Sequence, residues 1–506
     1  MLISIQNILG GQLSAIGNQR LEIDLPLSKS ESNRALMIMH YAELQNLETS
    51  KPQSHSNSVT QQLSNLVSLS NSDDTVILQQ HLNVLNEYVK NPSSVPLTLD
   101  CRNAGTVFRF LMTAVANQCI MHNAQFIIDE ELSLKQLSNS ATQQLSILLT
   151  GSERMKQRPV SSLVDALRNL GVSIEYTEKE GYPPVLLTVN AVNRQQSTDN
   201  GQQTLSTTLH PTLSTLNSLE ISAEQSSQFA SSLLLAAPLW KNGLALHLTG
   251  NLSSLPYIDM TINMMRQCGI DVSRDDRDII VMPGVYNVEN IKVEPDWSAA
   301  AFWYEMVSLS DGAEVLLKNL NINSLQADAA AIKMFECLGV ETFAAENGVV
   351  VSKPTANNQQ PTTNSQQPTA NSQLPIANSQ QPIAFNFKDC PDLFPAVIAA
   401  CAGNRVNATF TGLKNLSIKE SDRKQAMMNE LMKINITFEN VSDDELKMFC
   451  PNELSYFTEE KPIIFNNYED HRIAMALSVL SMKIGVISME NVEVVSKSYP
   501  GFFDFL

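Results

Sequence analysis

Cysteine is scarce in this sequence and follows no recognisable pattern. The seven cysteines are scattered over 506 residues, without a CxxC pair and without the spacing of a zinc site. An odd, dispersed set of thiols is typical of a reducing compartment. The pattern argues against a disulfide scaffold, and we expect no metal and no other cofactor.

Long apolar runs are also missing. No stretch is long enough to span a bilayer. No basic residue precedes Arg20, so the charged start of a signal peptide is absent. We therefore expect a soluble cytoplasmic protein without a membrane partner.

Positive charge is the third shortage. The chain has 34 lysines and arginines against 52 aspartates and glutamates, which gives a net charge of -18. This balance argues against nucleic acid as a partner, so any anion site has to be a local group of cations. The hydrophobic content of 43% suffices for sizeable cores, and the length predicts more than one domain.

Three polar stretches have the composition of insertions. Residues 51–74 are rich in Ser, Asn and Gln, and residues 193–218 in Thr, Ser and Gln. Prolines recur every seven residues between Pro361 and Pro382, a frequency that forbids a helix. We predict a disordered loop over residues 354–382, because their polarity leaves no apolar surface to offset the entropy of ordering.

Elsewhere helical and β-rich patterns alternate. Several expected helices end at glycine, as at Gly171, Gly269 and Gly339, and a strand pattern follows each of them. The repeated helix–Gly–strand unit predicts an α/β fold built from similar modules. We expect helices over residues 106–116, 161–170, 225–236, 257–268, 297–308, 328–338, 391–402, 421–434 and 470–481.

Residues 25–42 predict a loop that leads into a helix. A strand pattern over residues 21–25 gives way to apolar residues at helical spacing. Lys29, Ser30 and Arg34 crowd the expected helix start, where unpaired backbone N–H groups favour an anion. A well-capped helix with solvated charges is the alternative.

Two further loops have the same character. Asn103 and Gly105 lie between a strand pattern and a helix, and a glycine there lets backbone N–H groups approach an anion. Arg154 lies with two other cations in a loop before Pro159, a residue suited to a first helical position. An ordinary capped helix and a solvated loop are the respective alternatives.

Short polar side chains mark two more helix starts. Ser226, Ser227 and Gln228 open one apolar helix, and Ser254 precedes another. Such groups can hydrogen-bond sugar-like hydroxyls and phosphate, although the pattern is weak by itself.

Two carboxylates lie among cations in the last third of the chain. Asp392 heads the helix expected at 391–402, where an N-cap is the commoner role and a general base the alternative. Glu420 and Arg423 share a face if their helix begins near residue 420. With Lys419 they make either a structural ion pair or a proton-transfer group beside an anionic ligand.

The last cations accompany another helix start. We expect Asp470 to cap that helix and His471 to be structural, with Arg472 at the start and Lys497 further on. A pair of strongly anionic ligands explains the recurring cations better than scattered solvated ends do. These cations are Lys29, Arg34, Arg109, Arg154, Lys419, Arg423, Arg472 and Lys497.

In their order, these motifs resemble the EPSP synthase family. The match covers about residues 20 to 505 outside the insertions, and the order of six motifs is specific although each is weak alone. The segments are Pro-Leu-Ser-Lys-Ser-Glu-Ser-Asn-Arg, Asn-Ala-Gly-Thr, Thr-Gly-Ser-Glu-Arg-Met-Lys-Gln-Arg-Pro, Ser-Ser-Gln-Phe, Lys-Glu-Ser-Asp-Arg and Asp-His-Arg-Ile-Ala-Met.

The resemblance implies an α/β fold of two similar domains, each of repeated βαβαββ units (the enolpyruvyl transferase fold, an inside-out α/β barrel type). The chain is then expected to cross between the domains near Asp24 and Val293. Domain I would hold residues 1–24 and 293–506, and domain II residues 25–292, with the active site in the cleft. The family is usually monomeric, and we expect a monomer.

The resemblance also implies a reaction. The enolpyruvyl group of phosphoenolpyruvate moves to the 5-hydroxyl of shikimate 3-phosphate, with release of phosphate, on the way to chorismate. Asp392 matches the family's base for the hydroxyl, Glu420 its proton donor or partner, and Lys29 a further catalytic position.

Binding positions follow from the same resemblance. Those for shikimate 3-phosphate are Lys29, Ser30, Arg34, Ser226, Ser227, Gln228, Ser254, Asp392, Asn415 and Lys419. Those for phosphoenolpyruvate are Lys29, Asn103, Gly105, Arg154, Gln228, Arg423, Arg472 and Lys497.

The sequence departs from the family pattern at Leu27, where Gly is usual, at the bulky Trp297, and at Glu469, where Asn is common. These changes bear on affinity more than on the class of reaction. One rival is the enolpyruvyl transferase that acts on UDP-N-acetylglucosamine, whose mobile loop carries a cysteine that residues 150–159 lack. The other is a non-catalytic anion-binding protein of the same fold, which predicts lost carboxylates.

Overall fold

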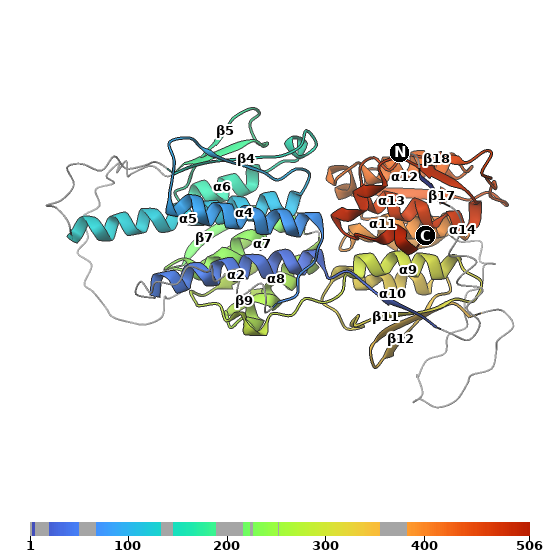
Figure 1. Cartoon of the computed structure of the whole chain (residues 1–506), viewed down its shortest axis with the longest axis horizontal. Helices are drawn as coiled ribbons and strands as arrows, with labels where there is room; N and C mark the ends of the chain where they lie inside the picture. The colour runs from blue at the N-terminus through green and yellow to red at the C-terminus, as the bar shows by residue number, and fades with distance from the viewer. Residues whose placement is uncertain are drawn as a thin grey trace. The chain divides into compact units, whose positions relative to one another are not determined.

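Two compact units divide the chain in this computed structural model (Figure 1). The structure describes residues 3–5, 20–49, 67–132, 145–188, 216–222, 226–250, 252, 254–354 and 382–505. Unit 1 comprises Met1–Lys29, Ser70–Asp73 and Glu294–Leu506, and unit 2 comprises Ser30–Leu69 and Asp74–Val293. The sequence analysis predicted crossings near Asp24 and Val293, with residues 70–73 in the second domain.

Unit 2 contains two four-stranded sheets with helices packed on them. Its helices are α2 (Lys29–Thr49), α4 (Asp73–Lys90), α5 (Gly105–Leu132), α6 (Ser161–Asn169), α7 (Ser227–Ala236) and α8 (Leu255–Gln267). One sheet has the order β3-β4-β6-β5 and the other β7-β8-β10-β9. The strands are β3 (Leu97–Asp100), β4 (Ser146–Thr150), β5 (Ser173–Tyr176), β6 (Val185–Thr188), β7 (Asn217–Ser222), β8 (Leu244–Thr249), β9 (Val272–Asp275) and β10 (Asp278–Val281).

Unit 1 contains two sheets of the same kind, β14-β15-β17-β16 and β12-β13-β11-β2, and a three-stranded sheet β1-β19-β18. Its helices are α9 (Trp297–Leu309), α10 (Ala331–Glu336), α11 (Phe394–Gly403), α12 (Arg423–Met432), α13 (His471–Val479) and α14 (Ser481–Ile484). Its strands are β1 (Ile3–Ile5), β2 (Leu21–Asp24), β11 (Glu314–Lys318), β12 (Glu341–Ala345), β13 (Gly348–Ser352), β14 (Ile383–Asn386), β15 (Ala408–Thr411), β16 (Thr437–Asn440), β17 (Glu445–Phe449), β18 (Ile463–Phe465) and β19 (Ile487–Met489).

One pairing rule recurs in the four-stranded sheets. The first two strands in chain order are parallel and the last two join them antiparallel, so the spatial order is first, second, fourth, third. β14 and β15 of unit 1 follow it, with Ile383 opposite Ala408 in parallel register. A parallel pair requires a crossover, which a helix supplies each time. The repetition confirms the predicted α/β fold of βαβαββ units.

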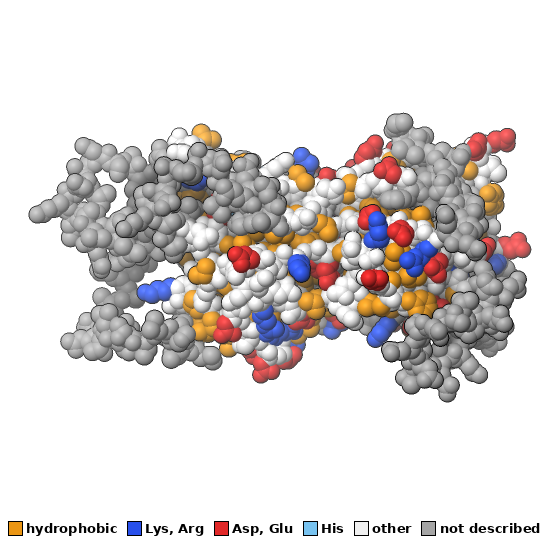
Figure 2. Space-filling view, turned by 60° about the horizontal axis from the view of Figure 1, so that its bottom comes forward, with side chains coloured by type: hydrophobic (Ala, Val, Ile, Leu, Met, Phe, Trp, Pro, Cys, Tyr) orange, Lys and Arg blue, Asp and Glu red, His pale blue; other side chains and the backbone are white. Residues whose placement is uncertain are grey.

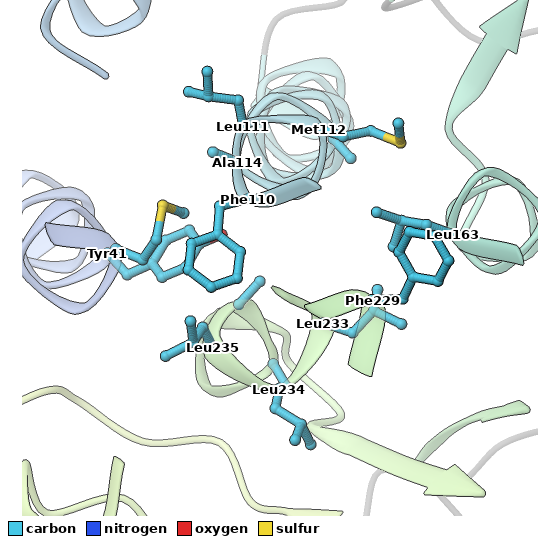
Figure 3. Close-up of a cluster of buried hydrophobic side chains, with 14 of the residues drawn as sticks. Tyr41, Phe110, Leu111, Met112, Ala114, Leu163, Phe229, Leu233, Leu234 and Leu235 are labelled. Atoms are coloured by element: carbon cyan, nitrogen blue, oxygen red, sulfur yellow. The ribbon is translucent and has the colours of Figure 1, made fainter. Parts of the chain in front are cut away.

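The core of unit 2 lies between its helices. Side chains of α2, α5, α6 and α7 point into one cluster in Figure 3, among them Tyr41, Phe110, Leu163 and Phe229. Each of these four is fully buried. Helices that are apolar on most faces belong inside a domain. This packing fixes the helix N-termini that carry the polar motifs.

The predicted helices are present, with different ends. α5 begins at Gly105 and is much longer than expected, and α12 begins at Arg423. The helix expected at 328–338 is split into a 3-10 turn, Ala327–Ala330, and α10. No helix in the described part of the chain combines the length and the apolar character needed to cross a bilayer.

The insertion predicted over residues 51–74 extends too far at its C-terminal end. α4 was not expected, and it begins inside the supposed insertion 51–74. Its signal is an apolar stripe of Ile77, Leu78, Leu82 and Leu85, all buried, which polar neighbours partly hide in the sequence. Residues 355–381, which cover nearly all of the predicted disordered loop, and residues 189–215 lie outside the described residues.

Candidate functional site

Several predicted site residues meet in unit 1 around one buried arginine. We call this group the acid–cation cluster, and its members are Asp392, Lys419, Glu420, Arg423, Asp470, Arg472 and Lys497. They come from four places in the chain: the 3-10 turn Pro391–Leu393, the segment that leads into α12, the start of α13, and the 3-10 helix Val492–Lys497 after β19.

Arg423 is the centre of the cluster and is 1% exposed. Its Nη1 donates to Asp392 Oδ1 at 2.6 Å, and its Nη2 to Glu420 Oε2 at 2.9 Å. Its Nε donates to Asp470 Oδ2 at 2.8 Å. Burial lowers the pKa of Arg423, but the three carboxylates outweigh it and raise the pKa above its ordinary value. Arg423 therefore orients both candidate acids.

The local sequence explains this geometry. Asp470 is the N-cap of α13, because its Oδ1 accepts from the backbone N–H of Arg472 at 3.0 Å, as predicted. Asp422 caps α12 through Gln425 N, which starts that helix at Arg423. The condition that the helix begins near residue 420 is therefore not met, although Glu420 still reaches Arg423.

Asp392 binds three cations. Besides Arg423, its Oδ1 lies 3.3 Å from Lys419 Nζ, and its Oδ2 accepts from Arg472 Nη2 at 3.0 Å. The N-cap of its 3-10 turn is Cys390, so Asp392 is not the capping residue. Burial raises its pKa, yet Arg472, Lys419 and Arg423 overcome that effect and hold the pKa of Asp392 well below the usual range.

Glu420 is the second acid of the cluster. Its Oε1 lies 3.3 Å from Lys497 Nζ, so it joins Arg423 to the segment after β19. His471 lies next to Arg472 and is fully buried. Burial, and then Lys29, Arg472 and Lys497, lower the pKa of His471 well below its ordinary value. The imidazole is therefore neutral, in keeping with the structural role expected for it.

Lys29 is anchored in unit 1 by its backbone. Its N–H donates to Asp296 Oδ2 at 3.3 Å, while Asp296 caps α9. The atypical Leu27 forms a single bridge with Pro295. The bulky Trp297 is completely buried and donates from Nε1 to Asn321 O at 3.1 Å, so unit 1 accommodates this departure.

In unit 2, Arg34 ties three helices together. It is fully buried, and its Nε donates to Thr261 Oγ1 of α8 at 2.7 Å. Its Nη1 donates to Ser30 O at 2.8 Å, and its Nη2 to Tyr257 O at 3.0 Å and Gln228 Oε1 at 3.4 Å. Burial lowers the pKa of Arg34 to about 10, so it stays charged at neutral pH. Its contacts hold Gln228 and Ser30 in place.

The α7 and α8 starts carry the remaining serines. Ser226 caps α7 by accepting from Gln228 N at 3.2 Å, and the neighbouring Ser227 is buried. Ser254 precedes α8 with a left-handed backbone (φ 57°) and makes no side-chain capping bond. Asn415 is half-buried in the 3-10 turn Lys414–Ile418 of unit 1, directly before Lys419.

Two arginines meet at the start of α5 in unit 2. Gly105 is so closely covered that a Cβ there would lie 2.4 Å from Arg158 Nη1 and 2.5 Å from Arg109 Nη1. Arg109 also stacks over the Phe229 ring at 5.1 Å, which links α5 to α7. Arg158 was not singled out from the sequence, where it is one of three cations in a loop. Arg158 is buried, which distinguishes it from Arg154 and Lys156 of the same loop.

The loop 150–159 lies against this place. β3 and β4 are parallel, with Asp100 opposite Thr150, so the two loops leave the sheet side by side. Ser152 N donates to Arg102 O at 2.8 Å across them, so the backbones of the two loops are in direct contact. Lys156 instead pairs with Glu153 and Glu178, so these carboxylates already compensate its charge.

Figure 2 shows that the visible described surface mixes Lys and Arg with Asp and Glu side chains rather than presenting a broad patch of one sign. Within the acid–cation cluster, neighbouring carboxylates compensate the lysines and arginines. Anionic ligands with phosphate or carboxylate groups suit such positions, and Asp392 and Glu420 can accept or donate protons beside them.

Comparisons with known proteins give one consistent result. The family model described as EPSP synthase (3-phosphoshikimate 1-carboxyvinyltransferase) matches residues 13–506. The 3-phosphoshikimate 1-carboxyvinyltransferase of Bacteroides fragilis is 31% identical over 495 residues, which are 98% of this chain and 96% of that protein. The protein of the same name from Sulfurovum sp. is 27% identical, over 96% of this chain and 95% of that protein.

Solved structures share the fold. An EPSP synthase from Acinetobacter baumannii matches with a TM-score of 0.57 at 20% identity, over all of this chain and 97% of that one. The enolpyruvyl transferase NikO from Streptomyces tendae matches with a TM-score of 0.56 at 12% identity, over all of this chain and 96% of that one.

Proposed function

The chain belongs to the EPSP synthase family, and on that basis we propose that the acid–cation cluster carries the proton transfers of its reaction. The protein transfers the enolpyruvyl group of phosphoenolpyruvate to the 5-hydroxyl of shikimate 3-phosphate and releases phosphate. The observation that supports the proposal most is the position of Asp392, which contacts Arg423, Arg472 and Lys419. We also propose that the protein is a cytoplasmic monomer without a nucleic-acid partner.

The proposed roles divide between the two acids. Asp392 takes the proton of the attacking hydroxyl, and Glu420, paired with Lys497 and Arg423, delivers a proton to the methylene carbon of phosphoenolpyruvate. The tetrahedral intermediate then loses phosphate together with a proton of its new methyl group, which returns to Glu420 and restores the C=C bond. The fixed cations hold the phosphates and carboxylates in reacting geometry and stabilise developing charge.

The electrostatics suggest how the base becomes active. In the free protein three cations hold the pKa of Asp392 well below its usual range, despite the burial that raises it, so Asp392 is a weak base. A general base works best when its pKa is near the operating pH. When the substrate anions engage Arg472 and Lys419, they offset the positive charge that stabilises the Asp392 carboxylate. Its pKa then rises, and the base is activated only with substrates present.

We also propose which residues bind each of the two substrates. We propose that phosphoenolpyruvate contacts Lys29, Asn103, Gly105, Arg154, Gln228, Arg423, Arg472 and Lys497. We propose that shikimate 3-phosphate contacts Lys29, Ser30, Arg34, Ser226, Ser227, Gln228, Ser254, Asp392, Asn415 and Lys419. Two observations support these sets. Several members contact one another, as Arg34 does Gln228 and Lys419 does Asp392. Ser254 is the N-cap of α8, yet its side chain makes no capping hydrogen bond.

A phosphate-release assay tests the reaction directly. The purified protein with phosphoenolpyruvate should release phosphate when shikimate 3-phosphate is added and not when UDP-N-acetylglucosamine replaces it. Release with the nucleotide sugar alone would favour the rival transferase. Binding of both proposed substrates without release would favour an anion-binding protein.

Gly105→Ala is expected to raise the KM for phosphoenolpyruvate. The added methyl group would lie within 2.6 Å of the Arg158 and Arg109 guanidinium groups, which would have to move from the start of α5. Steady-state kinetics should show a larger change in KM for phosphoenolpyruvate than for shikimate 3-phosphate. Gly284→Ala is the matched control, because its methyl group meets only the end of Ile270, at 3.3 Å. Equal effects of the two substitutions would count against a role for the α5 start.

A further inference from the structure

A buried carboxylate next to the cluster has no role in the scheme above. Asp328 lies in the 3-10 turn before α10 and is 3% exposed. Its Oδ2 accepts a hydrogen bond from Ser298 Oγ of α9. Its Oδ1 is buried and has no hydrogen-bond partner among the described residues. A buried carboxylate oxygen without a partner is costly, so its retention calls for a functional reason.

Asp328 shares Arg472 with the proposed base. The turn of Asp328 and the turn of Asp392 both pack against α9. Arg472 interacts electrostatically with both carboxylates but donates a hydrogen bond only to Asp392. The Nε of Arg472 is buried and, within the described part of the chain, has no hydrogen-bond partner. The Arg472 guanidinium thus attracts both carboxylates but is hydrogen-bonded to Asp392 alone of the two.

The charge of Asp328 changes near neutral pH. Burial and then Asp392 raise the pKa of Asp328 to about 6, while Arg472 and the Ser298 hydrogen bond oppose them. The other carboxylate that acts on it is Asp296, which also raises its pKa. The thiol of Cys390 stays neutral there, because burial and then Asp328 raise its pKa. Asp328 therefore changes its charge within the working range of pH.

We propose that Asp328 is a positioning residue of the transfer reaction: its carboxylate competes with Asp392 and with the substrate anion for Arg472. The inference rests on the proposed assignment of Arg472 to phosphoenolpyruvate. Ionised Asp328 draws Arg472 from Asp392, which leaves the base more basic, and repels the incoming anion. Protonated Asp328 leaves Arg472 to the anion and to Asp392. Both kcat and the KM for phosphoenolpyruvate therefore rise as Asp328 ionises.

Asp328→Asn isolates this effect, because it mimics the protonated acid. The ratio of the wild-type KM to the variant KM for phosphoenolpyruvate cancels the ionisation of the substrate itself. We expect this ratio to rise from about 1 at pH 5 to about 10 at pH 7.5, since tenfold corresponds to one pKa unit of coupling. The variant kcat should fall below the wild-type value over the same range, and the ratio for shikimate 3-phosphate should stay constant.

Two controls separate positioning from a structural role. Asp328→Glu restores an ionisable acid and should restore the pH dependence. Asp389→Asn removes an exposed carboxylate from the segment before Asp392 and should leave both ratios at about 1. Above pH 6 the Asn variant should also have a higher Tm than the wild type, because it removes a buried carboxylate that is ionised there at a cost. A ratio that does not change with pH overturns the proposal.

A measurement on the unaltered protein gives a second test. Sulfate stays dianionic throughout the range, so its binding should make Asp328 take up a proton near pH 6.5 and hardly any at pH 8.5. Calorimetry in buffers of different ionisation enthalpy measures this uptake. Absence of uptake at pH 6.5 overturns the proposal. A protein without transferase activity would instead reject the proposed function, so the two failures can be told apart.

Discussion

Asp392→Ala is expected to lower kcat about 10²-fold or more, because a positioned acid–base group contributes that much. Binding should survive, since Arg472, Lys419 and Arg423 lose an anionic competitor while Arg423 keeps Asp470 and Glu420. The KM for phosphoenolpyruvate should therefore stay the same or fall. This combination is the signature of a group that acts in the transition state rather than in binding.

Steady-state kinetics and calorimetric binding of each substrate measure the two parts of this result. Asp389→Asn is the control, because it removes an exposed carboxylate three residues away along the chain. Near wild-type turnover in Asp392→Ala would reject the role of the base. Loss of binding together with turnover would mean that Asp392 mainly holds the cations in place.

Asp470→Ala is expected to have the largest effect on stability. Asp470 is fully buried, accepts from Arg423 Nε at 2.8 Å and from Ser421 Oγ at 3.0 Å, and caps α13. Removing one partner of a buried ion pair costs about 3–5 kcal/mol, because the other charge stays buried. Turnover should fall as well, since Arg423 loses the bond from its Nε that helps to fix it in the position from which it orients Asp392 and Glu420.

Asp422→Ala is the matched control, because Asp422 caps the neighbouring helix α12 but is exposed and holds no buried arginine. Its loss should cost only about 1 kcal/mol, the usual effect of a lost N-cap. Urea unfolding followed by tryptophan fluorescence suits the comparison, because Trp297 and Trp303 are buried in unit 1. Equal losses in the two variants would show that Asp470 acts as a cap alone.

Local patterns predicted most of the fold. Helices such as α6 and α7 were found to within a few residues because apolar spacing and glycine stops are short-range signals. Their ends were less predictable, because a capping side chain decides them, as Asp422 does at Arg423. α4 was missed because the polar run before it resembles the start of an insertion.

The candidate site was predictable only in part. Motif order identified Asp392, but the sequence favoured a helix cap, because the three cations that bind it lie far away along the chain. Asp328 gave no signal, since no cation stands beside it in sequence and its environment is made by α9 and α13. Tertiary packing, which local patterns do not contain, brings these charges together.

The protonation of Asp392 with and without substrate tests the account most directly. Infrared difference spectra between the wild type and Asp392→Asn can follow this one carboxyl through a pH titration. The account predicts a carboxylate that resists protonation in the free protein, after exposed acids have been protonated, and a pKa that rises markedly when phosphoenolpyruvate is bound. A carboxyl that titrates like an exposed aspartate in the free protein, or a pKa that phosphoenolpyruvate leaves unchanged, would contradict it.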